Sequence, residues 1–106
     1  MSLTDYPNVL RLDGEIDLYV SPEIAVVLKR MTALRPVRLV VDLSGVTYID
    51  SSGLSVLINA VNDVEEYGGR LMLSGVQEHV RTIIDAAGLS GFFVAFPHVD
   101  AALAAV

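Results

Sequence analysis

Two adjacent serines are the residues of this sequence best placed to do chemistry. Ser51 and Ser52 follow Asp50 and precede Gly53, between an apolar run and a segment with helical periodicity. The first amides of a helix have no partner within the helix, and the helix dipole adds positive charge, so a phosphate on a hydroxyl there would be tolerated. The same pattern is also typical of an ordinary helix start, with Ser51 only an N-cap and Gly53 only a close-packing residue.

Four segments share one helical pattern, with apolar residues at positions i, i+3, i+4 and i+7. Ser21 is expected to cap the first helix, Gly68 and Gly69 to end the second, and Gly88 to end the third, while the fourth runs to the end of the chain. The four apolar stripes are Ile24, Val27, Leu28 and Met31; Leu54, Leu57, Ile58 and Val61; Val80, Ile83, Ile84 and Ala87; and Val99, Ala102, Leu103 and Val106.

Short β-type runs at 9–12, 38–43, 70–74 and 92–95 separate these helices. A turn is expected between the second run and the serines. The alternating order predicts right-handed crossovers and an α/β fold, with a largely parallel or mixed sheet of about four to five strands and about four amphipathic helices. We expect residues 1–106 to form a single domain. The residues before Pro7 are too few and too polar to predict a further antiparallel strand.

Charge and composition exclude several classes of partner and site. The chain carries 7 Lys and Arg against 13 Asp and Glu, a formal charge of −6, which repels nucleic acid and anionic membranes and suits a protein partner with a basic face. Cysteine is absent, and no segment has the apolar length to cross a bilayer, so a cytoplasmic location is expected. His79 and His98 lack metal-ligand spacing and read as surface or capping residues, and no metal or cofactor is predicted.

A family resemblance emerges at the serines. Ile49-Asp50-Ser51-Ser52-Gly53-Leu54, after a Val-Val-Asp-Leu-Ser strand, closely resembles the motif of the STAS family, the domains of anti-sigma-factor antagonists. Three more landmarks follow in the family's order: Leu12-Asp13-Gly14-Glu15-Ile16-Asp17, Gly68-Gly69-Arg70-Leu71 and Ala87-Gly88-Leu89. Four landmarks in order are a far more specific signal than one short motif.

The resemblance implies a bacterial partner-switching module of transcription regulation and not an enzyme. In that family a partner anti-sigma factor, a serine kinase with an ATPase fold like that of histidine kinases, phosphorylates the serine that corresponds to Ser51. The unphosphorylated form binds this kinase and frees the sigma factor. Phosphorylation ends the binding, because it adds about −1.5 to −2 charges to a fitted interface, and a serine phosphatase restores it.

The family's pattern also implies a set of partner-binding residues around the phosphorylation site. Asp50 could equally be a residue just ahead of the helix cap, and the spacing of Leu54 also fits a core position. The implied set is Asp17, Asp50, Ser51, Ser52, Gly53 and Leu54.

Two other functions stay open. STAS-like domains also serve as partner subunits of ABC-type lipid-transport ATPases or of stress-signalling assemblies, and the fold does not separate these roles. The intact Asp-Ser-Ser-Gly-Leu favours the switched antagonist. A small serine hydrolase is the remote alternative, since the segment lacks the first glycine of Gly-x-Ser-x-Gly and no histidine is evidently placed as a base.

Overall fold

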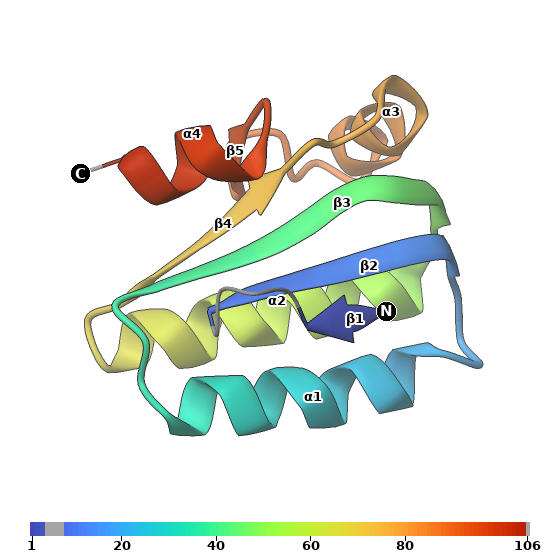
Figure 1. The fold of residues 1–106 in the computed structure, drawn as a ribbon. Coiled ribbons are helices and arrows are strands. Elements are labelled where there is room, and N and C mark those ends of the chain that lie inside the picture. Colours follow the sequence, from blue (N-terminus) through green and yellow to red (C-terminus); the bar gives the residue numbers. More distant parts are fainter. Residues whose placement is uncertain (4–7, 106) are drawn as a thin grey trace.

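One five-stranded sheet organises the chain (Figure 1). A computed structural model describes residues 1–3 and 8–105. Its strands are β1 (Ser2–Leu3), β2 (Val9–Ile16), β3 (Arg38–Ile49), β4 (Arg70–Ser74) and β5 (Val94–Phe96), and its helices are α1 (Ser21–Ala33), α2 (Ser51–Glu66), α3 (Glu78–Ala86) and α4 (Val99–Ala104). Strands β2 to β5 are parallel neighbours in chain order, and β1 adds an antiparallel edge strand beside β2. The predicted α/β fold with a mixed sheet is confirmed.

The two faces of the sheet are covered unequally. Helices α1 and α2 lie side by side on one face, and α4 covers the opposite face (Figure 1). Successive side chains of β3 point to opposite faces of the sheet. Leu39 and Val41 belong to the larger apolar cluster, with α1 and α2, whereas Val40 packs with Ala102 of α4 in a smaller cluster. A strand covered on both faces reads as a continuous apolar run, as predicted for this segment.

The predicted turn before the serines is wrong, since β3 runs on for 12 residues to Ile49. At two places β3 carries one extra residue relative to β2: Arg11 and Asp13 pair with Asp42 and Gly45, and Gly14 and Glu15 pair with Val46 and Tyr48. These bulges change the spacing of the buried side chains, which lie at Val41, Leu43, Val46 and Ile49. Buried residues that lie three positions apart, in place of two, hide the alternation of apolar and polar residues by which a strand is predicted.

The C-terminal elements lie close to their predicted places. Strand β5 begins two residues later than expected, and α4 ends at Ala104, so the prediction that this helix reaches the end of the chain is wrong at Ala105; Val106 lies outside the described residues. His98 is the N-cap of α4, with Nδ1 accepting a hydrogen bond from the amide of Ala101 at 3.2 Å. Its predicted capping role is confirmed.

Two glycines end helices as predicted. Gly68 and Gly88 follow α2 and α3 with φ of 85° and 77°, a region that other residues enter only at a cost. Among the helices of residues 1–3 and 8–105, none combines the length and the apolar content of a membrane span. The same residues contain no group of three or more acidic or histidine side chains arranged to hold a metal ion.

Candidate functional site

The carboxyl ends of β2 and β3 bring the two main sequence motifs together. Helices α1 and α2 both begin at this edge of the sheet, which we call the carboxyl edge (Figure 1). Ile16 pairs with Ile49, and the amide of Asp50 donates a hydrogen bond to the carbonyl of Ile16 at 3.1 Å. The loop that begins at Asp17 and the start of α2 are therefore joined through the backbone.

Asp50 is the N-cap of α2. Its Oδ1 accepts a hydrogen bond from the amide of Gly53 at 3.1 Å, and its carbonyl accepts one from the amide of Leu54 at 2.9 Å. The predictions that Ser51 is the cap, or that Asp50 lies just ahead of it, are both wrong. A cap residue needs an extended backbone, which Asp50 has because β3 continues to the residue before it.

Ser51 is the first residue of α2, and its side chain is exposed. Its carbonyl accepts a hydrogen bond from the hydroxyl of Ser55 at 2.9 Å. Within the part of the chain that the structure describes, the Ser51 hydroxyl itself makes no hydrogen bond. Ser52 is half-buried. A modifying enzyme can therefore approach the Ser51 hydroxyl without breaking a contact of the folded domain.

Gly53 and Leu54 lie beneath this surface. A Cβ atom at Gly53 would stand 2.7 Å from side-chain carbons of Ile16 and Ile49, so only glycine lets the first turn of α2 pack on the ends of β2 and β3. Leu54 is buried in the larger cluster. Both residues help to fix where α2 begins, and the Leu54 side chain packs in the core and not at the surface.

Asp17 organises the loop between β2 and α1. Its Oδ1 accepts hydrogen bonds from the amides of Tyr19 at 3.0 Å and Val20 at 3.2 Å. Its carbonyl accepts from both the amide and the hydroxyl of Ser21, at 3.0 and 2.6 Å. The prediction that Ser21 caps α1 is wrong: the N-cap is Val20, and the Ser21 hydroxyl is already committed to Asp17. Such an Asx-type turn is a common use of aspartate in a tight loop.

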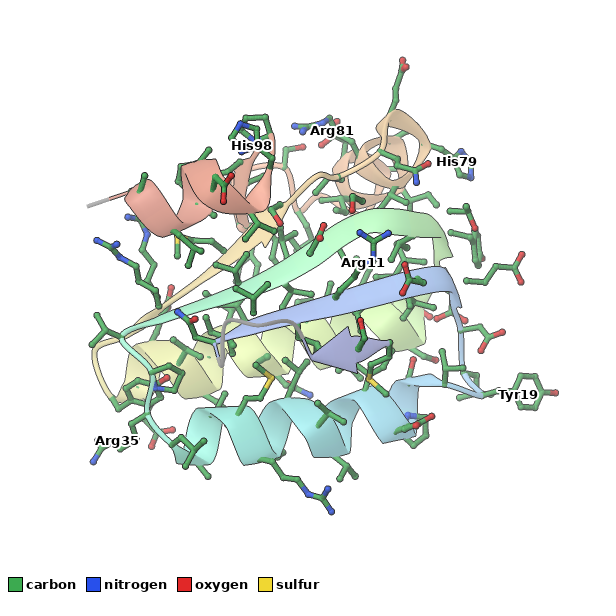
Figure 2. All side chains as sticks on the ribbon, viewed as in Figure 1. Arg11, Tyr19, Arg35, His79, Arg81 and His98 are labelled. Atoms are coloured by element: carbon green, nitrogen blue, oxygen red, sulfur yellow. The ribbon has the colours of Figure 1, made fainter. Side chains whose placement is uncertain are left out.

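This loop presents two large side chains that the sequence reasoning missed. Leu18 is 64% exposed and Tyr19 is 90% exposed. Figure 2 shows Tyr19 extending away from the body of the domain into solvent. The available signal was a pair of bulky residues, outside any helical stripe, between an aspartate and a Ser-Pro helix start.

The carboxyl edge is acidic. Segments 12–28 and 43–69 contain no Lys or Arg. Two cations lie beside one of the carboxylates in these segments: Arg11 donates from Nε to Asp13 at 2.9 Å and from Nη1 to Ser44 at 3.1 Å, and the amino terminus of Met1 lies 3.7 Å from Asp13 Oδ2. A pocket of about 220 Å³ beside Val20 and Met1 is lined by both apolar side chains and carboxylates. Its described lining includes Leu12, Ile16 and Ile24 with Asp13, Glu15 and Glu23.

Neither histidine serves the exposed serine. His98 uses Nδ1 to cap α4, and His79 is exposed on α3 (Figure 2). No hydrogen bond joins either imidazole to Ser51 among the residues described. The site thus has an accessible hydroxyl, a helix N-terminus and carboxylates, with no base in contact with the hydroxyl.

Comparisons with known proteins agree on one family. The STAS domain profile matches residues 2–102. The anti-sigma-B factor antagonist of Listeria monocytogenes is 30% identical over 87 residues, which cover 82% of this chain and 75% of that protein. An anti-sigma factor antagonist structure from Mycobacterium paratuberculosis matches with a TM-score of 0.82 at 28% identity, over 94% of this chain and 86% of that one. The phosphorylated Bacillus cell fate determinant SpoIIAA shares the fold, with a TM-score of 0.70 at 19% identity over 93% and 92%.

Proposed function

Because the chain belongs to the STAS-domain family, we propose that it is an anti-sigma factor antagonist whose partner binding is switched by phosphorylation of Ser51. The unphosphorylated domain binds an anti-sigma factor serine kinase, with an ATPase fold like that of histidine kinases, and so frees a sigma factor. Phosphorylation ends this binding and a serine phosphatase restores it. In this proposal the domain acts in the cytoplasm as a kinase substrate and has no catalysis of its own.

The observation that carries the proposal is the exposed hydroxyl of Ser51, which bonds to none of the described residues, beside a helix cap supplied by Asp50. In the transfer, the Ser51 oxygen bonds to the γ-phosphorus of ATP, the bridging oxygen leaves with ADP, and the hydroxyl proton passes to a base. The capping bond between Asp50 and Gly53 takes no part in that step. The domain therefore keeps its fold while the surface at the start of α2 changes.

Release follows from charge and bulk together. The modified serine carries about −1.5 to −2 charges, next to the carboxylate of Asp50 and opposite the anionic phosphates of the nucleotide that supplied the group. The added group also needs room that a closely fitted interface does not have. Repulsion and occlusion both act at the contact surface, so the switch requires no rearrangement of the sheet.

A hydrolytic role is disfavoured by the same geometry. A serine nucleophile requires a base within hydrogen-bond reach, and in the described structure neither histidine contacts Ser51. The backbone around the serine is a strand running directly into a helix, yet the glycine that precedes the serine in the Gly-x-Ser-x-Gly elbow is absent.

The test is affinity capture from a lysate of the source organism with four baits: wild type, Ser51→Ala, Ser51→Asp and Asn59→Asp. Asn59 is exposed further along α2, so its substitution adds the same charge to the same helix away from the site. We expect wild type, Ser51→Ala and Asn59→Asp to retain a small histidine-kinase-like ATPase, and Ser51→Asp to lose it. Mass spectrometry should find phosphate on Ser51 in a fraction of the wild-type protein. Equal recovery of an ABC-type ATPase by all four baits would instead assign a constitutive subunit role.

A further inference from the structure

We propose that Leu18 and Tyr19 form an apolar anchor by which the partner kinase holds this domain, and that Asp17 is the positioning residue for that anchor. The inference rests on the proposed function, since it concerns the same partner. It differs from the family expectation about Asp17, because it assigns the contact with the partner to the two side chains that follow the aspartate.

Preorganisation is the first argument. Asp17 Oδ1 accepts hydrogen bonds from two amides of the loop itself, those of Tyr19 and Val20, and the Asp17 carbonyl accepts from Ser21 at the start of α1. The loop backbone is thus fixed before any partner arrives. Binding then does not require the loop backbone to become ordered, and only the rotamer freedom of the two side chains is lost, which favours affinity.

Location is the second argument. The loop follows β2 directly, and the amide of Asp50 is bonded to the carbonyl of Ile16, one residue before Asp17. A kinase that reaches the Ser51 hydroxyl must cover the carboxyl edge. Other strongly exposed apolar residues, Leu34 at 81% and Val37 at 76%, lie where α1 ends and β3 begins, at the opposite edge of the sheet.

Chemistry is the third argument. Tyrosine is among the residues that most often dominate binding energy when they fill a partner's pocket, because a rigid ring buries a large area. The anchor follows Asp17 in the chain, and its segment, 12–28, contains no Lys or Arg and four acidic residues, Asp13, Glu15, Asp17 and Glu23. The complementary surface is an apolar pocket rimmed by Lys and Arg, which both attracts this edge and excludes basic competitors.

Asp17 Oδ1 already accepts hydrogen bonds from two backbone amides, so this oxygen has little capacity to bind a partner. An asparagine oxygen accepts the same two bonds and removes the charge. Asp17→Asn and Asp17→Ala therefore separate positioning from direct charge contact.

The test uses the full chain and the purified kinase identified by the capture experiment. Isothermal titration should show Tyr19→Ala binding roughly tenfold to a hundredfold more weakly than wild type, with Leu18→Ala intermediate. Leu34 is 81% exposed at the opposite edge, between the values for Leu18 and Tyr19, and Leu34→Ala should bind within about twofold of wild type. In a phosphorylation assay, loss of the anchor should raise KM for the domain and leave kcat nearly unchanged.

The Asp17 variants complete the test. We expect Asp17→Asn to bind within about threefold of wild type, and Asp17→Ala to lose most of what Tyr19→Ala loses. The double variant Asp17→Ala/Tyr19→Ala should bind little worse than Tyr19→Ala, because the two changes remove one contact. Thermal unfolding of each variant checks its fold, and the exposed Tyr19→Ala remains decisive if Asp17→Ala is unstable.

Three results would overturn the inference. If Tyr19→Ala and Leu18→Ala bind the kinase with wild-type affinity, the anchor proposal is refuted and the proposed function is unaffected. Equal losses in Asp17→Asn and Asp17→Ala mean that the carboxylate charge itself meets the partner. Failure of the wild-type domain to bind any histidine-kinase-like ATPase removes the proposed function, and the anchor assignment with it.

Discussion

Replacing Asp50 by alanine should destabilise the domain by about 1 kcal/mol, because the amide of Gly53 loses its capping acceptor. Gly53 is a buried residue in the first turn of α2, so water cannot readily take the place of the carboxylate. For a domain of this size, that loss corresponds to a fall in melting temperature of roughly 4–8 °C. Asp50→Asn keeps an acceptor oxygen in the same place and should unfold within about 0.5 kcal/mol of wild type.

Urea unfolding followed by circular dichroism measures both variants, and an unchanged m-value ensures that the midpoints compare stabilities. Asp63→Ala is the matched control. Its carboxylate pairs with Lys29 at 2.7 Å, but the Lys29 side chain is 67% exposed, and an exposed ion pair contributes only about 0–1 kcal/mol. An Asp50→Ala protein as stable as wild type, or an Asp50→Asn protein as unstable as Asp50→Ala, would refute the assignment of Asp50 as the cap through its acceptor oxygen.

Two further predictions are checked by the same urea unfolding measurement. Gly53→Ala should lose about 1–2 kcal/mol, although alanine normally favours a helix, because the new methyl would stand 2.7 Å from carbons of Ile16 and Ile49; a stabilised variant would contradict the packing argument. Tyr67→Phe should lose about 1 kcal/mol near neutral pH, since the Tyr67 hydroxyl donates to the carbonyl of Pro36 at 2.7 Å. Burial raises the pKa of Tyr67 above its ordinary 10.0, against the opposing charge of Arg35, so wild-type stability should fall as pH rises past that value and the difference from Tyr67→Phe should shrink. A difference that stays constant from about pH 8 to 11 would show that folding leaves this pKa unchanged.

The sequence predicted the helices and their alternation with strands because those signals are local. The apolar stripes of the helices repeat with a fixed period, and Gly68 and Gly88 mark two helix ends through a backbone conformation that favours glycine. The second half of β3 was not predictable in the same way. Its bulges are defined only relative to β2, so the buried positions Val46 and Ile49 fall out of alternation when the strand is read alone.

The sequence motif located the site, but it did not show which residue has which structural role. The motif placed Asp50 and Ser51 together, but which of them caps α2 depends on where β3 ends, and that end was misplaced by the predicted turn. The exposure of Tyr19 had a similar cause. No helical or strand period covers this loop, so its sequence does not tell whether Tyr19 packs in the core or at the surface. Its exposure follows from the turn in which Asp17 Oδ1 accepts hydrogen bonds from the amides of Tyr19 and Val20.

Asp50 caps α2 and Ser51 carries the exposed hydroxyl, and this separation of roles affects how the proposed switch would work. If Ser51 were the cap, phosphorylation would replace the capping oxygen, and each cycle of modification would perturb the start of α2. With Asp50 as the cap, the proposed phosphorylation of Ser51 would leave the capping oxygen of the first turn in place, and the added charge would act at the surface. Gly53 makes this arrangement possible. Because it has no side chain, the first turn of α2 packs against Ile16 and Ile49, and the Ser51 hydroxyl stays at the surface.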